Sequence, residues 1–271
     1  MLLDRFKVTD KVAIVTGSGR GIGAACALAL AEAGADVVIT ARTQGDLDEV
    51  AAQVGALGRR AVAVPADLAD LANLDLLVDA AVSELGRLDI VVNNVGGTMP
   101  MPFIYTTEEF LEEAFHFNVT TAFGLSRRAL PHLIESDGAA IVNISSAMGR
   151  LTERGYLAYG TAKAALAHMT RLMASDLAPR VRVNALAVGS VATSALDIVM
   201  QSEELKTTME QATPLRRLGE PEEIALAVLY LASPAAAWIT GKVFEIDGGT
   251  EYPNLTLPLP DLDPSNVRPE S

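Results

Sequence analysis

The sequence is poor in cysteine, histidine and basic residues, and each scarcity excludes a class of protein. Its 271 residues include one cysteine, Cys26, so no disulfide can form within the chain, which favours a cytosolic protein. Acidic residues outnumber basic ones by 34 to 21, a formal charge of −13 that argues against nucleic acid or an anionic membrane as a partner. The three histidines lack the spacing of metal ligands, and we expect no metal site.

Long uninterrupted apolar runs are also lacking. Charges at Asp4, Arg5 and Lys7 break the start of the chain, where an export signal needs an apolar core. One uncharged run, residues 224–241, is long enough to cross a membrane. Pro234 lies within it and favours a buried helix followed by a turn. We therefore expect a cytoplasmic protein without a membrane span.

Seven short β-branched runs alternate with Ala- and Leu-rich helical patterns. The runs are apolar on both faces, as buried parallel strands are. This order predicts one doubly wound α/β domain of Rossmann type over residues 1–250, with a seven-stranded parallel sheet and helices on both faces. The predicted strands are 11–16, 36–40, 61–65, 88–93, 139–144, 181–186 and 242–247.

Helix and loop signals agree with that fold. Thr106 and Glu109 have the spacing of a capping box, and Pro221 with two glutamates is typical of a first helical turn. Residues 189–218 carry no strand signal and predict a lid-like excursion. Five prolines in residues 250–271 exclude regular structure from the tail, 251–271. We favour a disordered end, and the alternative is an arm that packs on a neighbouring subunit.

The first predicted strand runs directly into "TGSGRGIG" (16–23), and a helical pattern follows. Such a turn lets backbone N–H groups and the positive end of a helix approach a pyrophosphate. The glycine spacing is TGxxxGxG rather than GxGxxG, and a purely structural turn is the alternative. The expected cofactor contacts are Gly17, Ser18, Arg20, Gly21, Ile22 and Gly23.

The end of the second predicted strand indicates which dinucleotide binds. A carboxylate there would hydrogen-bond a ribose and favour NAD. Asp36 lies at the opposite end of that strand, Ala41 stands at the expected acidic position, and Arg42 follows. Arg42 together with Arg20 could hold a 2′-phosphate. We therefore expect NADP(H) rather than NAD(H), the alternative being that Arg42 is a solvated loop residue.

In "YGTAK" (159–163), Tyr159 and Lys163 are one helical turn apart and share a helix face. A fixed ammonium at that distance lowers the pKa of a phenol, so Tyr159 could give and take a proton near neutral pH. With the glycine turn, "NNVGG" (93–97), Asn118 and "NISS" (143–146), this pair resembles the motifs of the short-chain dehydrogenase/reductase family. The likeness covers roughly residues 8–250, and the motifs are most similar to those of the bacterial NADP-dependent group that includes 3-oxoacyl-carrier-protein reductases.

The resemblance implies a catalytic tetrad of Asn118, Ser146, Tyr159 and Lys163. Ser146 precedes the tyrosine by the family's usual spacing, and Ser145 would then support the backbone. In the family, the lysine also binds the nicotinamide ribose, the serine holds the substrate oxygen and the asparagine supports a water. Further implied cofactor contacts are Asp67, Leu68, Asn94, Gly96, Gly189, Val191 and Thr193. Val95 and Val188 depart from the family's usual alanine and proline.

The substrate region is less specific. Met99, Met101, Phe103 and Met148 indicate an apolar pocket or fill gaps under loops, and both interpretations stand. Glu153 and Arg154 are expected to face water. The acidic charge favours a small apolar carbonyl or alcohol over an acidic carrier protein.

The sequence therefore predicts an NADP(H)-dependent oxidoreductase that interconverts a ketone, or a 3-oxoacyl thioester, with a secondary alcohol. The resemblance implies a homo-oligomer, most often a tetramer. The alternative is a non-catalytic NADP-binding redox sensor or scaffold on the same fold.

Overall fold

The computed structural model describes residues 1–193, 196 and 201–263, so part of the predicted 189–218 excursion and the tail end 264–271 lie outside the described residues. Seven parallel strands form one sheet in the order β3-β2-β1-β4-β5-β6-β7. All seven predicted strands are confirmed. They are β1 (Val12–Thr16), β2 (Asp36–Ala41), β3 (Ala61–Pro65), β4 (Ile90–Asn93), β5 (Ala139–Ser146), β6 (Val181–Val188) and β7 (Val243–Ile246).

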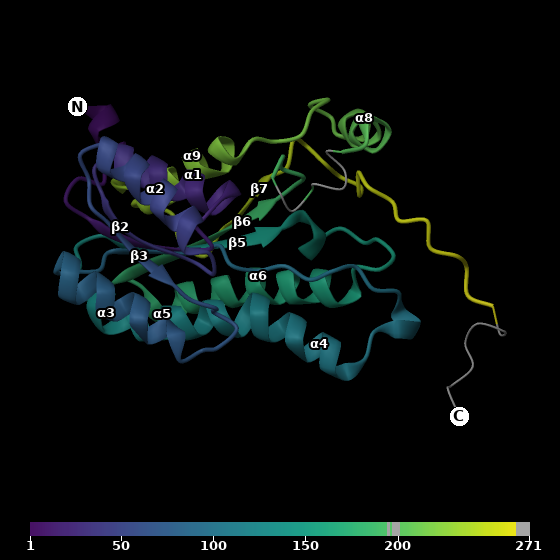
Figure 1. Cartoon of the computed structure of the whole chain (residues 1–271), viewed down its shortest axis with the longest axis horizontal. Coiled ribbons are helices and arrows are strands. Elements are labelled where there is room, and N and C mark those ends of the chain that lie inside the picture. Colours follow the sequence, from purple (N-terminus) through teal and green to yellow (C-terminus); the bar gives the residue numbers. More distant parts are fainter. Residues whose placement is uncertain (194–195, 197–200, 264–271) are drawn as a thin grey trace.

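Helices cover both faces of the sheet, as Figure 1 shows, which confirms the Rossmann-type fold. One face carries α1 (Gly21–Glu32), α2 (Gln44–Ala56) and α9 (Pro221–Ala232). The other carries α3 (Asn73–Leu85), α5 (Thr121–Leu133) and α6 (Leu157–Leu177). α4 (Glu108–Phe115) packs on α6, and α8 (Glu203–Ala212) lies within the predicted excursion.

The core consists of two apolar layers, one on each side of the sheet. β1 is buried along its whole length because it faces helices on both sides. Leu30 and Ile39 belong to one layer, and Leu77 and Ile141 belong to the other. Cys26 lies in the first layer, where burial raises the pKa of its thiol to about 12, so it acts as a packing residue.

The helix termini lie where the sequence predicts them, except that the N-cap residue of α4 differs from the prediction. The N-cap of α4 is Thr107, which accepts a hydrogen bond from the Phe110 N–H, and not Thr106. The Thr106 hydroxyl instead donates to the carbonyl of Pro102 in the preceding turn. At α9, Pro221 occupies the first turn as expected. None of the helices in the described ranges is both long and apolar enough to cross a bilayer.

The described part of the tail has no regular structure but contacts the rest of the chain. Residues 251–263 form no helix or strand. After leaving the sheet they pass α8 and extend beyond it (Figure 1). Arg154 donates to the Leu259 carbonyl at 3.0 Å and pairs with Asp261 at 2.6 Å, so it does not simply face water as expected. Glu153 accepts a hydrogen bond from Thr256 at 3.3 Å. Polar groups on the tail supply these partners, and proline prevents a regular element but not such contacts.

Candidate active site

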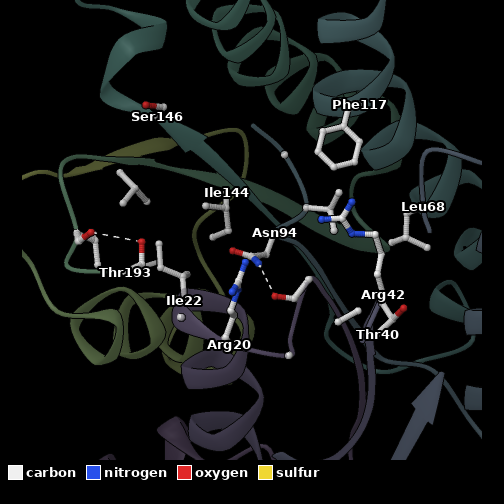
Figure 2. Close-up of a pocket in the computed structure, with 18 of the residues that line it drawn as sticks. Arg20, Ile22, Thr40, Arg42, Leu68, Asn94, Phe117, Ile144, Ser146 and Thr193 are labelled. Carbon is white, nitrogen blue, oxygen red and sulfur yellow. Dashed lines mark hydrogen bonds between the residues drawn. The ribbon is translucent and has the colours of Figure 1, made fainter. Parts of the chain in front are cut away.

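A pocket of about 790 Å³ opens at the carboxyl ends of the strands (Figure 2). It lies where β1 and β4 are neighbours, the point at which the chain switches from one side of the sheet to the other. Open α/β sheets bind ligands at such a point. Its walls come from the β1–α1 turn, the segments at the ends of β2, β3, β4, β5 and β6, and the first turns of α6.

The glycine turn is built on close backbone approach. A Cβ on Gly23 would lie 2.1 Å from the carbonyl oxygen of Gly17, and Gly17 itself has a φ of +63°. Gly17, Arg20, Gly21 and Ile22 line the pocket as predicted. Gly23 does not line it, because it packs beneath the turn.

Ser18 is also outside the pocket lining. Its hydroxyl donates to the Val15 carbonyl at 2.8 Å and accepts from the Thr40 N–H at 2.9 Å. Its own N–H donates to the Thr40 carbonyl at 2.9 Å. Ser18 is fully buried and ties the turn to β2, so its hydroxyl does not face the pocket in which the cofactor contact is predicted.

The end of the pocket beside β2 carries Arg42, and Arg20 lies nearer Asn94 (Figure 2). Arg20 and Arg42 are exposed, line the pocket, and form no ion pair with any residue of the described ranges (Figure 2). Ala41, at the expected acidic position, also lines it. Asp46 lines this end too, and sequence reasoning missed it because it lies in the first turn of α2 rather than at the end of β2. A Cβ on Gly19 would meet the Asp46 side chain at 3.0 Å.

The opposite wall follows β3 and β4. Asp67, Leu68, Asn94 and Gly96 line the pocket as predicted. The Asn94 amide donates to the Thr16 carbonyl at 2.9 Å and so braces the glycine turn. Val95, where the family usually has alanine, packs against Gly17. A Cβ on Gly17 would lie only 3.1 Å from a methyl carbon of Val95, so the glycine leaves the room that the larger side chain needs.

Tyr159 and Lys163 meet in the first turns of α6. The Lys163 Nζ lies 5.7 Å from the centre of the Tyr159 ring and donates to the Ile144 carbonyl at 2.9 Å. Burial lowers the pKa of Lys163 to about 8. Burial also raises the pKa of Tyr159, with a smaller contribution from Tyr156, whereas a hydrogen bond with Ser146 opposes the rise. The expected lowering by Lys163 is therefore not observed, because burial favours the neutral form of both groups.

The two neighbouring serines have separate roles. Ser146 ends β5, lines the pocket beside Tyr159, and accepts the Met148 N–H at 3.2 Å. Ser145 is buried, and its hydroxyl donates to the Lys163 carbonyl at 2.9 Å. Ser145 thus supports the backbone of α6, as expected.

Asn118 is buried and lies in a π-helical segment, His116–Thr120, which the sequence did not predict. Its amide donates to the Ala114 carbonyl at 2.8 Å, and its Oδ1 accepts the Gly97 N–H at 2.9 Å. Asn118 does not line the pocket, but its Oδ1 and the Lys163 Nζ both lie 2.7 Å from where a Cβ on Gly96 would stand. Asn118, Lys163 and Tyr159 are thus brought together as the resemblance implies.

The remaining predicted positions border the far end of the pocket. Gly189, Val191 and Thr193 line it. A second cavity of about 90 Å³ adjoins it and shares Ser146 and Gly189. Of the four predicted apolar pocket residues only Met148 lines a described cavity, and Met99 and Phe103 are 71% and 72% exposed.

The chain is similar to known proteins over most of its length. The family described as "Enoyl-(Acyl carrier protein) reductase" matches residues 17–251. An "uncharacterized oxidoreductase" of Mycobacterium tuberculosis is 59% identical over 263 residues, 97% of this chain and 100% of that protein.

Two solved structures have the same fold. A 7α-hydroxysteroid dehydrogenase with NADH and 7-oxo glycochenodeoxycholic acid is 37% identical, covers 93% of this chain and 98% of its own, and has a TM-score of 0.88. The RhlG/NADP complex of Pseudomonas aeruginosa is 34% identical, with coverages of 91% and 98% and a TM-score of 0.85. The chain belongs to the short-chain dehydrogenase/reductase family of oxidoreductases.

Proposed function

We propose that the chain is an NADP(H)-dependent oxidoreductase that interconverts a ketone, or a 3-oxoacyl thioester, with a secondary alcohol. The observation that carries this proposal is the convergence of Tyr159, Ser146 and Lys163 in a pocket that also presents Arg20 and Arg42, two arginines without an ion pair in the part of the chain that the structure describes. A dinucleotide extends from a phosphate-binding end to a reactive ring, and the pocket has the corresponding polarity.

The residues present fit such a cofactor. The absence of side chains at Gly17 and Gly21, both with positive φ, leaves the turn before α1 open for a pyrophosphate at the helix N-terminus. Gly96 leaves room beside Lys163, since any side chain there would meet its Nζ. The cofactor would be held by the glycine turn, Asn94 and Lys163, and when bound it would supply or accept the hydride.

The chain's own residues would manage the proton and the substrate oxygen. Tyr159 has a raised pKa and is a phenol at neutral pH, so it can donate to a carbonyl oxygen that becomes an alkoxide. The Ser146 hydroxyl beside it would hold that oxygen. Lys163 would orient the cofactor ribose, and Asn118 next to it would support a water through which protons are resupplied.

The preference for NADP(H) rests on charge. Arg20 and Arg42 offer two guanidinium groups, and Asp46 offers one carboxylate. Guanidinium forks match the oxygens of a phosphate, so we propose that Arg42 and Arg20 hold the 2′-phosphate.

We also propose a cytoplasmic homo-oligomer, and a tetramer is the expected form. Phe123 of α5, Leu172 of α6 and Leu226 of α9 are 47%, 56% and 64% exposed, and the β7 edge has no strand partner within the described residues. Apolar side chains on these surfaces favour burial against other copies.

The test is a spectrophotometric assay of NADPH and NADH oxidation with neutral ketones, acetoacetyl thioesters and quinones, run beside Tyr159→Phe. Turnover that depends on Tyr159 supports the oxidoreductase and identifies its substrate class. Tight NADPH binding without turnover of any class would instead favour a cofactor-binding sensor or scaffold.

A further inference from the structure

The tail does more than end the chain, because its first residues border the second cavity beside Ser146. Thr250, Pro253, Asn254 and Leu255 line that cavity. We propose that residues 250–255 form a wall of the substrate pocket, in which Asn254 is a positioning residue and Leu255 sets the size of the substrate. This inference rests on the ketone reduction proposed above.

Asn254 joins two segments that are distant in the sequence. Its Oδ1 accepts a hydrogen bond from the Ser190 hydroxyl at 2.9 Å, and its Nδ2 donates to the Thr213 hydroxyl at 2.9 Å. Ser190 follows β6 and lines the cofactor pocket, and Thr213 is the C-cap of α8. One side-chain amide therefore links the end of α8 to the loop after β6, which lines the cofactor pocket.

The hydrogen-bond chemistry of the pair requires an amide. The Thr213 hydroxyl donates its hydrogen to the Met209 carbonyl at 2.8 Å, so towards Asn254 it can only accept. Ser190 donates, so it needs an acceptor. A carboxamide offers one donor and one acceptor, whereas a carboxylate at position 254 would leave Thr213, which is buried, facing an acceptor.

Leu255 completes the apolar side of the cavity. It packs in a small cluster with Met209 of α8 and Leu218. The described lining includes no charged side chain; its apolar members besides Leu255 are Ala147, Met148, Leu151, Val188, Leu196, Met209 and Pro253. A charged group placed there would lose its hydration without compensation. The wall therefore suits a neutral, apolar ketone.

The segment is held on both sides of this wall. Arg150 donates to Asp247 at 2.7 Å and to the Thr250 carbonyl, which fixes the segment where it leaves β7. Further along, Arg154 holds Leu259 and Asp261. Two anchors in the loop after β5 thus keep residues 250–255 against the cavity.

Substrate size provides the first test. NADPH-dependent kcat/KM is measured for cyclohexanone, 2-decalone and 5α-androstane-3,17-dione, three neutral ketones of increasing bulk. Leu255→Ala is expected to raise the ratio of the steroid to cyclohexanone at least fivefold, and Leu255→Trp to lower it by a similar factor. The matched control Leu262→Ala alters an exposed leucine of the same tail and should leave the ratio unchanged. A ratio within twofold of wild type in both Leu255 variants would overturn the size-setting role.

The second test addresses Asn254. Asn254→Ala and Asn254→Asp should raise the KM for each ketone at least fivefold, while kcat and the NADPH dissociation constant stay within threefold. In the same proteins, hydrogen exchange in α8 should be at least fivefold faster and exchange in α1 unchanged, which also shows that the variants fold. Unchanged KM and unchanged α8 exchange contradict the positioning role. If wild type reduces no ketone, the proposed function fails, and α8 exchange alone still decides whether Asn254 fastens α8.

Discussion

The cofactor end and the substrate end of the pocket are built by different means. At the cofactor end, the contacts are made to the backbone of the glycine turn: a Cβ on Gly23 would lie 2.1 Å from the Gly17 carbonyl oxygen, and the Asn94 side-chain amide donates to the Thr16 carbonyl at 2.9 Å. At the substrate end, side chains from the loop after β5, from α8 and from the tail meet across a small cavity. The shape of the first end depends on close approach to the backbone, and the shape of the second depends on which side chains the loops and the tail supply.

This difference separates chemistry from specificity. Tyr159 and Lys163 stand at the boundary between the two ends, on a helix that both ends contact. Catalytic groups on a rigid helix keep their geometry while the loops opposite them vary. On the proposed function, the cofactor end is the rigid end that sets the type of reaction, and the substrate end sets the choice of substrate.

The largest effect is expected at that boundary. Tyr159→Phe removes the proposed proton donor and should lower kcat for ketone reduction by about a thousandfold, within the range of general acid catalysis. The NADPH dissociation constant, measured by fluorescence, should stay within twofold, because the phenol is not part of the glycine turn.

Tyr156→Phe is the matched control for this prediction. The Tyr156 ring lies 6.4 Å from the Tyr159 ring and lines the neighbouring cavity. Removing its hydroxyl should cost at most about tenfold in kcat/KM, the worth of one neutral hydrogen bond. Equal losses in the two variants would remove the distinction between a proton donor and a pocket wall.

The next largest effect is expected in the glycine turn. Gly23→Ala should weaken NADPH binding about a hundredfold, because the new methyl group meets backbone that cannot move aside cheaply. Gly45→Ala in α2 is the control: nothing lies within 4 Å of its new Cβ, so NADPH binding should be unchanged. Titration of NADPH fluorescence measures both. Full affinity in Gly23→Ala would show that the turn is not as rigid as its geometry indicates.

The rigid end is also the part that could be read from the sequence. The seven strands, the glycine turn and the Tyr159–Lys163 pair are signalled by residues close together in the chain, and the structure confirms the strands and brings the pair together. The burial of the Ser18 hydroxyl could not be predicted, because a serine beside a glycine turn gives no sign of whether its hydroxyl faces the pocket or the core.

The substrate end could not be read in this way. Asn254 meets Ser190 and Thr213, which are 64 and 41 positions away, and no local pattern announces such a pairing. Met99 and Phe103 have the right composition for a pocket but are mostly exposed. The raised pKa of Tyr159 was missed for a similar reason, since burial depends on the whole fold.

A smaller effect separates the two dinucleotides. Arg42→Asp should weaken NADPH binding about thirtyfold, the scale of a charge-assisted hydrogen bond to phosphate. NADH binding should change less than threefold or improve, since a carboxylate there can accept from a ribose hydroxyl. Paired isothermal titrations with NADPH and NADH measure the difference. Parallel losses for both would show that Arg42 does not read the 2′-phosphate.

The smallest effect concerns the proton on Lys163. Its pKa is about 8 in the protein alone, below the ordinary value of 10.5, because it is buried. If its ammonium binds the cofactor ribose as proposed, the protonated form binds better and NADPH affinity should fall as pH rises above 8. Binding at pH 9 should then take up close to one proton, and binding at pH 7 only about a tenth of one. Titration calorimetry in buffers of different ionisation enthalpy measures this uptake.

The lowered pKa of Lys163 also affects the unfolding free energy, which should rise with pH where NADPH affinity falls. Between pH 8 and 10.5 the unfolded chain holds more protons at Lys163 than the folded protein does, so this group makes the unfolding free energy of the cofactor-free protein rise with pH across that window. Lys163→Met should lose both this rise and the proton uptake, whereas the control Lys206→Met, at a half-buried lysine of α8 outside the pocket, should keep both. If the unfolding free energy rises with pH but NADPH binding takes up no proton, Lys163 is buried as described but does not bind the cofactor as an ammonium. Its role would then be limited to packing in the first turns of α6.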